Sequence, residues 1–258
     1  MRWRVNSVVI IPARLGASRF PGKPLANIAG IPMIGHCYFR AKLTPGIDDV
    51  FVATCDEEIA KYVHSIGGKF IMTSNTHTRA STRTAEALEI IESNTDKKID
   101  IVVMFQGDEP LISPEDVAKT INNFSDSSVK VVNIMSQFRS IEAFKDKNNV
   151  KVVVDKNNDA LYFSREPIPS LWKESENVPH YMQTGIISFR RDALYNFNNT
   201  SETMLERVES IDLNRILESG NKVRMIPTDK LTIGVDTPDE LKNAEKILLS
   251  DPIFKLYS

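Results

Sequence analysis

Four short apolar runs, rich in β-branched residues, constrain the fold most, because each is followed by a segment with helical spacing. The runs lie at residues 8–11, 50–54, 70–72 and 101–105. A strand covered on both faces reads as such a continuous apolar run, and strands that alternate with helices assemble into a parallel sheet. The pattern therefore predicts an α/β protein with a doubly wound, mostly parallel sheet.

The second half of the chain is less regular. We expect strands at 129–135, 150–154, 161–164 and 186–189, a helix at 204–217, and extended segments at 222–227 and 231–235. Residues 165–183 are rich in proline and charge, which is typical of a loop or lid and not of a linker between domains. The chain has 258 residues, of which 41% are hydrophobic, so we expect one large domain over 1–258.

Charge and cysteine content exclude some classes of function. Lys and Arg number 32 against 34 for Asp and Glu, so the net charge of −2 gives no reason to expect nucleic acid or an anionic membrane as a partner. No apolar stretch approaches the roughly 20 residues of a membrane span, and the apolar run near the N-terminus is too short for a secretory signal. Cys37 and Cys55 have no metal-site spacing, so we expect free thiols in a reducing cytoplasm.

The loop that follows the first predicted strand concentrates glycine, proline and cations. Gly16 and Gly22 would let backbone N–H groups approach an anion, and the loop also carries a hydroxyl and three cationic side chains: Ser18, Arg14, Arg19 and Lys23. This composition favours a polyphosphate cradle. An ordinary connection between a strand and a helix, with solvated cations, accounts for the same residues, and the Walker pattern is not met.

Two aspartates each follow a predicted strand. Asp108 lies in the segment Gln106-Gly107-Asp108-Glu109-Pro110, directly after the most apolar strand, and Asp236 follows the extended segment 231–235. Ligands of open α/β sheets bind beyond the carboxyl ends of the strands, where a carboxylate can hold Mg²⁺ against phosphate oxygens. Alternatively, Asp108 caps the helix that begins near Pro114, although Ser113 is already placed to do so.

Several motifs coincide in order along nearly the whole chain. They are Ile11-Pro12-Ala13-Arg14 with Ser18-Arg19, Pro21-Gly22-Lys23-Pro24-Leu25, Gln106-Gly107-Asp108-Glu109-Pro110, Ala160-Leu161-Tyr162-Phe163-Ser164-Arg165 with Ile168-Pro169, and Val235-Asp236-Thr237-Pro238-Asp239. Together they resemble the 3-deoxy-manno-octulosonate (Kdo) cytidylyltransferases, also called CMP-Kdo synthetases. The resemblance implies a glycosyltransferase-A-like sandwich, usually a homodimer, in which 155–220 is a smaller inserted region for the lid, the sugar and dimerisation.

The same resemblance implies an activity for cell-surface polysaccharide synthesis, such as that of lipopolysaccharide. CTP and a 3-deoxy-2-ulosonic acid sugar would give a CMP-sugar and pyrophosphate, with Mg²⁺ held by Asp108 and Asp236 and no side-chain nucleophile. The catalytic residues would be Arg14, Lys23, Asp108 and Asp236; the nucleotide would meet Ala13, Arg14, Ser18, Arg19, Lys23, His77, Arg83 and Gln106; and the sugar would meet Arg165, Gln183, Glu209, Asp212 and Arg215.

The chain departs from the family pattern in three places. The family's His-x-Ser-Gly-Thr-acidic-Arg reads His77-Thr78-Arg79-Ala80-Ser81-Thr82-Arg83 here; its His-x-Gly-Ile-Tyr reads Gln183-Thr184-Gly185-Ile186-Ile187; and its Leu-Glu-Gln-Leu-Arg reads Ile211-Asp212-Leu213-Asn214-Arg215. The first change puts the cytosine contacts in question. The phosphate loop and both metal carboxylates are intact, so we expect cytidylyl transfer to be retained.

The departures leave the acceptor open. Loss of a buried polar contact is worth on the order of 1–3 kcal/mol, enough to shift preference between related sugars, so a modified or longer ulosonic acid is one hypothesis and plain Kdo, with drift at rim positions, is the other. A CMP-nonulosonate synthetase, which makes sialic-acid-like CMP-sugars, or another sugar nucleotidyltransferase is an alternative enzyme. A nucleotide-binding protein without catalysis is the alternative from another class.

Overall fold

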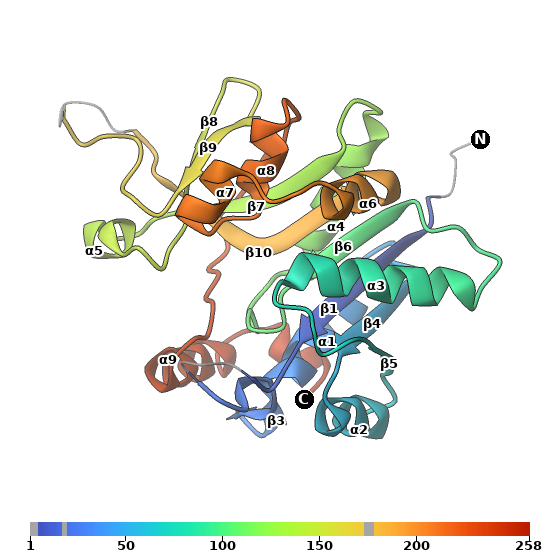
Figure 1. Ribbon diagram of the computed structural model, residues 1–258. Coiled ribbons are helices and arrows are strands. Elements are labelled where there is room, and N and C mark those ends of the chain that lie inside the picture. Colours follow the sequence, from blue (N-terminus) through green and yellow to red (C-terminus); the bar gives the residue numbers. More distant parts are fainter. Residues whose placement is uncertain (1–4, 17–19, 173–177) are drawn as a thin grey trace.

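The computed structural model describes residues 5–16, 20–172 and 178–258, and these build one central sheet between two layers of helices (Figure 1). The main path of the sheet has the strand order β11-β7-β10-β6-β1-β4-β5. Along this path every neighbouring pair is parallel except the two pairs that β10 makes, with β6 and with β7. The predicted doubly wound, mostly parallel sheet is confirmed.

The elements have the following bounds. The strands are β1 (Ser7–Ala13), β2 (Asn27–Ile28), β3 (Ile31–Pro32), β4 (Asp49–Thr54), β5 (Lys69–Met72), β6 (Ile101–Phe105), β7 (Val131–Gln137), β8 (Lys151–Val154), β9 (Ala160–Ser164), β10 (Tyr181–Arg190) and β11 (Arg224–Thr228). The α-helices are α1 (Met33–Lys42), α2 (Glu57–Ser65), α3 (Ala80–Ser93), α4 (Pro114–Asn122), α5 (Ile141–Lys145), α6 (Arg191–Asn199), α7 (Met204–Glu209), α8 (Leu213–Glu218) and α9 (Pro238–Leu248). Short 3₁₀ turns are η1 (Lys23–Leu25), η2 (Asn123–Ser125) and η3 (Phe254–Leu256).

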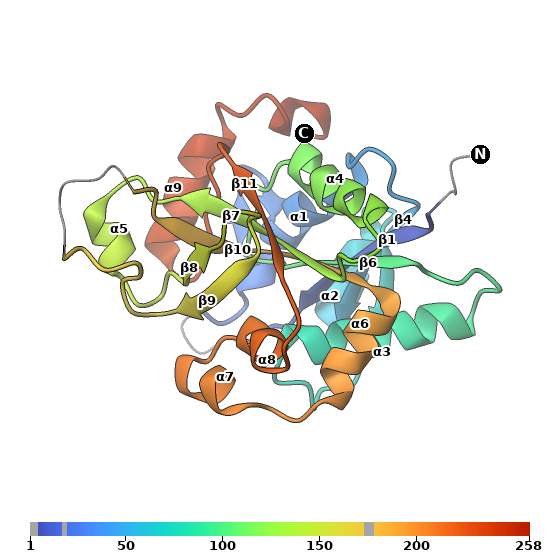
Figure 2. The same ribbon diagram turned by 90° about the horizontal axis from the view of Figure 1, so that it is seen from above.

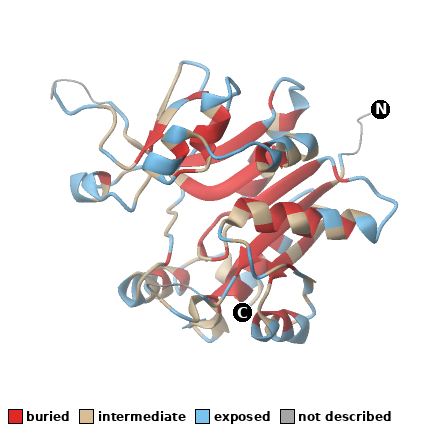
Figure 3. Ribbon diagram, viewed as in Figure 1, coloured by how far each residue is buried: buried red, intermediate tan, exposed pale blue. Residues whose placement is uncertain are grey.

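The two faces of the sheet carry separate apolar cores, because successive side chains of a strand point to opposite faces. In β1, Val8 and Ile10 belong to the core under α3, α6 and α8, whereas Val9 and Ile11 belong to the core under α1, α2 and α4. Figure 2 shows α1 and α4 on one side of the sheet and α3, α6 and α8 on the other. The strands between them are buried, while the outer faces of the helices are exposed (Figure 3).

The second half of the chain differs from its predicted elements in three respects. The strand expected at 186–189 is longer, running over Tyr181–Arg190, and it lies antiparallel in the centre of the sheet. The helix expected at 204–217 is two short helices, because Ser210 adopts a left-handed conformation with φ of 54° between α7 and α8. Residues 231–235 do not join the sheet but lead directly to the start of α9.

The C-terminal segment folds back onto α1. After α9, the hydroxyl of Tyr257 lies 3.0 Å from Nδ1 of His36 and accepts a hydrogen bond from Nε of Arg40, both of which are buried in α1. Arg40 also forms an ion pair with Asp251. No described helix is both long and apolar enough to cross a membrane.

Candidate active site

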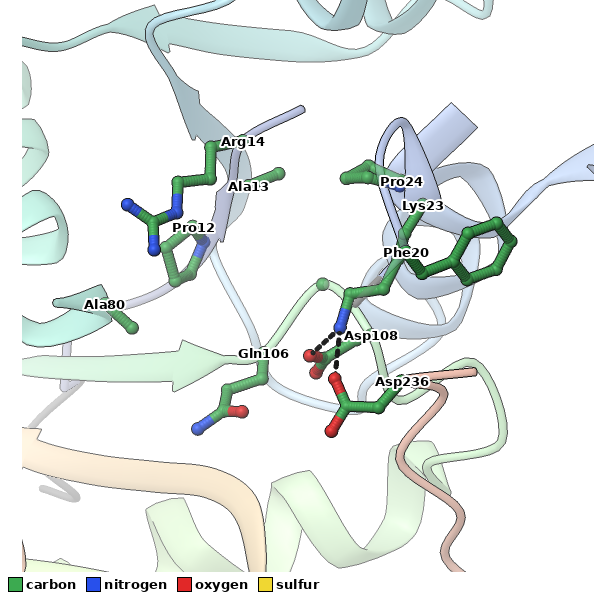
Figure 4. A pocket seen from close by; sticks show the side chains of 11 residues that line it. Pro12, Ala13, Arg14, Phe20, Lys23, Pro24, Ala80, Gln106, Asp108 and Asp236 are labelled. Carbon is green, nitrogen blue, oxygen red and sulfur yellow. Dashed lines mark hydrogen bonds and ion pairs between the residues drawn. The ribbon is translucent and has the colours of Figure 1, made fainter. Parts of the chain in front are cut away.

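Lys23, Asp108 and Asp236 meet beyond the carboxyl ends of β1 and β6. The Nζ atom of Lys23 lies 2.8 Å from Oδ2 of Asp108 and 2.8 Å from Oδ1 of Asp236 (Figure 4). The lysine side chain is 12% exposed, against 27% and 37% for the two carboxylates. The sequence analysis placed both aspartates and a cationic loop at strand ends. Asp108 does follow β6, but the expectation for Asp236 was wrong, because the segment before it is not a strand. One lysine of the loop lies between the two carboxylates.

Local hydrogen bonds fix the loop that carries Lys23. Gly22, whose φ of +73° favours glycine, stands at the start of η1 and donates its N–H to the carbonyl of Leu15, 3.1 Å away. The N–H of Leu15 in turn donates to Oδ2 of Asp56 at 2.8 Å. The Gly22 N–H, which we expected to face an anion, is therefore used within the loop, and the side chain of Asp56, just before α2, also holds the loop.

The two aspartates are fixed from the opposite side. The N–H of Val235 donates to the carbonyl of Asp108 at 2.8 Å, which joins the segment before α9 to the end of β6. The N–H of Asp236 donates to Oε2 of Glu240, and the hydroxyl of Thr237 caps α9 by accepting the N–H of Glu240. Asp236 thus directly precedes a capped helix, and its own N–H is held by the Glu240 side chain of that helix.

The electrostatics of the site favour a bound cation. Burial disfavours the charged form of Lys23, but the attraction of Asp108 and Asp236 outweighs it and raises the pKa of the ammonium. Burial, aided by the charge of Asp108, raises the pKa of the neighbouring Glu109 to about 8. Glu109 accepts the N–H of Gly185 at 2.5 Å, so this second carboxyl belongs to the contact between β6 and β10.

Asp108 and Asp236 fit a Mg²⁺ ion, since the ammonium of Lys23 shows that one positive charge can lie against both carboxylates. Mg²⁺ is commonly held by one or two carboxylates with substrate phosphates and water completing its coordination. Among the described residues, no group of three or more His, Cys, Asp or Glu forms a metal site. Phosphate oxygens and water would therefore have to supply the remaining ligands.

Two cavities meet at these residues. The first cavity, of about 310 Å³, lies beside the loop after β1 and is lined by Pro12, Ala13, Arg14, Phe20, Lys23, Pro24, Ala80, Gln106, Gly107, Asp108 and Asp236. The second cavity, of about 520 Å³, lies between the ends of β7, β10 and the segment before α9. Both cavities are lined by Gln106, Asp108 and Asp236. A ligand bound in one cavity can therefore meet a ligand bound in the other beside the two carboxylates.

Of the residues predicted to meet a nucleotide, four line the first cavity, namely Ala13, Arg14, Lys23 and Gln106. His77 and Arg83 instead hold the loop before α3: His77 pairs with Glu86, and Arg83 donates to the hydroxyl of Thr73 at 2.5 Å. The carbonyl of His77 accepts a hydrogen bond from Arg14 at 3.4 Å. Ser18 and Arg19 lie outside the described residues.

Of the residues predicted to meet the sugar, Gln183 lines the second cavity. The other four, which line neither cavity, take part in contacts within the protein. Glu209 accepts hydrogen bonds from Tyr162, Ser164 and the N–H of Arg165, whose own Nε donates to the Glu209 carbonyl. Arg215 forms a buried ion pair with Glu206, and Asp212 pairs with Arg79.

Sequence reasoning missed several residues that line the cavities. Ala80 lines the first cavity, and Glu109, Thr184 and Arg139 line the second. A signal for Glu109 was present in the motif Gln106-Gly107-Asp108-Glu109-Pro110, where it stands next to a proposed metal ligand. Two adjacent acidic residues at the end of a buried strand are costly to bury, so such a pair indicates a functional site. The others carry no such signal, because an isolated Ala, Thr or Arg is common on any surface.

The fold and these two joined cavities define a nucleotidyltransferase. A model of the family described as cytidylyltransferase matches residues 8–224. A 3-deoxy-manno-octulosonate cytidylyltransferase of Thermodesulfovibrio yellowstonii is 40% identical over 249 residues, which cover 94% of this chain and 98% of the relative. One from Escherichia coli is 37% identical over 246 residues, covering 95% and 97%. The chain belongs to the 3-deoxy-manno-octulosonate cytidylyltransferase family.

Solved structures agree with this assignment. A CMP:2-keto-3-deoxy-manno-octonic acid synthetase complexed with CTP superposes with a TM-score of 0.86 at 37% identity, covering 95% of this chain and 99% of the other. A 4-diphosphocytidyl-2C-methyl-D-erythritol synthase from Anaerococcus prevotii, at 15% identity and a TM-score of 0.64, covers 95% of this chain and 96% of its own. The second similarity concerns the fold alone.

Proposed function

We propose that this protein transfers the cytidylyl group of CTP to the anomeric hydroxyl of Kdo, or of a modified Kdo, and releases pyrophosphate. The observation that carries the proposal is the position of Asp108, Asp236 and Lys23 where the two cavities meet. The first cavity would take CTP and the second the sugar. The attacking hydroxyl would then reach the α-phosphorus beside two carboxylates and one ammonium. The family membership supports this proposal, because the relatives reported above are named 3-deoxy-manno-octulosonate cytidylyltransferases.

The reaction needs positioning and charge neutralisation more than it needs a reactive side chain. The oxygen of the anomeric hydroxyl forms the new bond to the α-phosphorus while the bond to the β-phosphate bridging oxygen breaks, and negative charge develops on the leaving pyrophosphate. Arg14 and Lys23, both on the wall of the first cavity, supply positive charge on that side. Gln106, which lines both cavities, is placed to orient either substrate by hydrogen bonding.

Asp108 and Asp236 would hold Mg²⁺, which would neutralise phosphate oxygens and lower the pKa of the attacking hydroxyl. Binding requires that Lys23 move its ammonium away from the carboxylates, toward the polyphosphate. Replacing Asp108 with Asn should therefore reduce kcat by at least about 10²-fold, as loss of one transition-state contact does.

A matched control keeps that experiment specific. Asp126, an exposed aspartate that accepts hydrogen bonds from Ser128 in a surface turn, should tolerate the same change to Asn with activity unchanged. Circular dichroism would show whether the Asp108→Asn variant is folded. A folded variant that turns over normally would refute the assignment of Asp108 to the metal.

The acceptor is tested by measuring pyrophosphate release with CTP against a panel of 2-ulosonic acids. Gln183 replaces the histidine of the family pattern on the wall of the second cavity, and this change supports a modified or longer sugar. Strong activity with unmodified Kdo alone would reject the modified sugar. Calorimetry with CTP, UTP and ATP tests the nucleotide, and a preference for UTP or ATP would count against the cytidylyltransferase proposal.

The proposal extends to assembly and location. We expect a homodimer formed through region 155–220, in which Leu161 of β9 and Met204 and Val208 of α7 are exposed aliphatic side chains. Burial of such side chains between two copies would remove apolar area from water. Light scattering would measure the mass, and a monomer at micromolar concentration would contradict this expectation. We also expect the enzyme to act in the cytoplasm, where CTP is made.

A further inference from the structure

Arg79 is surrounded by carboxylates that come from the α7 and α8 segment. Its guanidinium pairs with Asp212, donates from Nε to Glu202 at 2.8 Å, and lies 3.7 Å from Glu206. The Arg79 and Asp212 side chains are each 23% exposed, so solvent screens this pair only partly. Asp212 receives a further hydrogen bond, at 3.0 Å, from the hydroxyl of Ser81. One carboxylate thus holds two residues at the start of α3.

The residue between those two contacts lines the first cavity. Ala80 is the first residue of α3, with Arg79 before it and Ser81 after it, and Figure 4 shows it at the cavity on the same side as Arg14. No side chain caps this end of α3 by a hydrogen bond. The position of Ala80 in the wall of the first cavity therefore depends on the contacts that Arg79 and Ser81 make with Asp212.

Arg79 and Asp212 join two elements that lie far apart in the sequence, the start of α3 and the start of α8. A change at either residue therefore removes a charged partner from the other.

We propose that Asp212 is a positioning residue for the nucleotide, fastening the α3 edge of the first cavity to α8, and that it does not bind the sugar. The inference rests on the proposed function, since it assigns CTP to the first cavity. Its ligand class is a nucleoside triphosphate, because Ala80 lines the same cavity as the cationic residues Arg14 and Lys23. Asp212 would act on this ligand only through Arg79, Ala80 and Ser81.

The test is calorimetric titration of CTP into the protein without acceptor, combined with steady-state kinetics in which each substrate is varied separately. Asp212→Asn keeps the size of the side chain but removes its charge. We expect the Kd for CTP to rise about tenfold, the loss that one charge-assisted hydrogen bond typically causes. The KM for the acceptor should change less than twofold. A raised acceptor KM with an unchanged Kd for CTP would overturn the inference.

Two further variants keep the test decisive. Arg79→Gln breaks the same pair from the other end, so it should weaken CTP binding to a similar extent, and the double variant should be no worse than the worse single variant because the two residues share one interaction. Glu202→Gln is the matched control, since it removes the more exposed partner of Arg79 and leaves Asp212 in place. Additive losses in the double variant would contradict the coupling.

The proposed function and this inference fail in different ways. If the unchanged protein binds no CTP, the proposed function is wrong. If the unchanged protein binds CTP and folded Asp212→Asn binds it equally tightly, the function stands and the positioning role is wrong. Thermal unfolding of each variant, measured in parallel, separates a local change at α3 from a general loss of stability.

Discussion

Lys23 places an ammonium between two carboxylates, so a metal ion at this position must compete with a side chain that the protein supplies. Asp108 and Asp236, without a counterion, would repel each other, and the lysine relieves that repulsion at 2.8 Å from each. When a triphosphate binds, it offers the ammonium a new partner. The same ammonium can then pair with the two carboxylates when no nucleotide is bound and with the triphosphate when one is.

Replacing Lys23 with Gln should therefore separate metal affinity from turnover. Without the ammonium, a divalent cation no longer has to displace Lys23 from Asp108 and Asp236, and we expect Mn²⁺ affinity in the absence of nucleotide, measured by calorimetry, to increase roughly tenfold. We expect kcat to fall by about 10²-fold, because the phosphate loses a cation. Lys61→Gln, on the exposed surface of α2, should change neither quantity. Unchanged Mn²⁺ affinity in Lys23→Gln would contradict a metal site at these aspartates.

The two cysteines should differ in reactivity although both are free thiols. Cys37 is fully buried in α1, and burial raises the pKa of its thiol, so the reactive thiolate is scarce. Cys55, after β4, is partly exposed. A chromogenic disulfide reagent should modify one thiol rapidly in the native protein and two after denaturation. Rapid modification of both in the native state would contradict the burial of Cys37.

At the scale of elements, the contact between β10 and the end of β6 shapes the second cavity. Gly185 accepts the N–H of Gln106 and donates its own N–H to Glu109, and the register of β10 against β7 shifts between Gln183 and Ile187. A Cβ atom at position 185 would lie 2.5 Å from Oε1 of Glu109 and 2.9 Å from the Cβ of Gln106. The close approach of these two strands therefore requires glycine.

Gly185→Ala should destabilise the protein by about 1–3 kcal/mol, the usual cost of overpacking, and should weaken acceptor use more than CTP binding. Urea unfolding would measure the free energy. Gly234→Ala is the matched control, because a Cβ there meets nothing within 4 Å and its stability should change by less than about 0.5 kcal/mol. Equal stability of the two variants would argue against the tight contact at Gly185.

Elements defined by local pattern were predicted well, and those set by distant contacts were not. The apolar runs in β1, β4 and β6 and the proline and serine at the start of α4 carry their own signals. The direction of β10 and its place between β6 and β7 depend on pairing with residues 44 to 58 positions away in β7 and 81 to 89 positions away in β6, for which a single sequence has no periodicity to show. The sequence also gives no sign that the helix is interrupted at Ser210, because serine is not a strong helix breaker.

At the candidate site, the sequence predicted which strand ends would meet but not which side chains would touch. Lys23 and Asp108 come together because β1 and β6 are parallel neighbours whose carboxyl ends share one edge of the sheet. Asp236 does not follow a strand, and it reaches them because the N–H of Val235 donates to the carbonyl of Asp108. Asp212 was predicted to meet the sugar, a role carried over from a motif. Its pairing with Arg79 joins residues 133 positions apart and follows only from how α8 packs beside α3.

For the whole molecule, a buried histidine of α1 should make stability depend on pH. His36 is buried with Nε2 2.8 Å from the carbonyl of Ile28, and burial, with the nearby charge of Arg40, lowers the pKa of its imidazole. The unfolded chain binds a proton below its ordinary pKa of about 6.5, whereas the folded chain does not. The stabilisation from neutral His36 is therefore present above that pH and is lost as the pH falls toward the lowered pKa.

We expect the free energy of unfolding to decrease between pH 7 and pH 5, by up to about 1.4 kcal/mol per pH unit from this group. His36→Gln should show a smaller slope, while His64→Gln, exposed on α2, should keep the slope of the unchanged protein. Denaturant titrations at several pH values would measure the free energy of unfolding of each variant and hence its slope against pH. An identical slope in His36→Gln would show that another group is responsible.

The place of β10 also bears on how the chain is made. A ribosome releases β6 and β7 well before residues 181–190, yet β10 is the strand that pairs with both of them and lies between them in the sheet. Until β10 emerges, β6 has one free edge, and an unpaired edge is open to pairing with other chains. The nascent protein thus passes through a period in which its central strand needs shielding, which makes the middle of the chain a natural client of chaperones during translation.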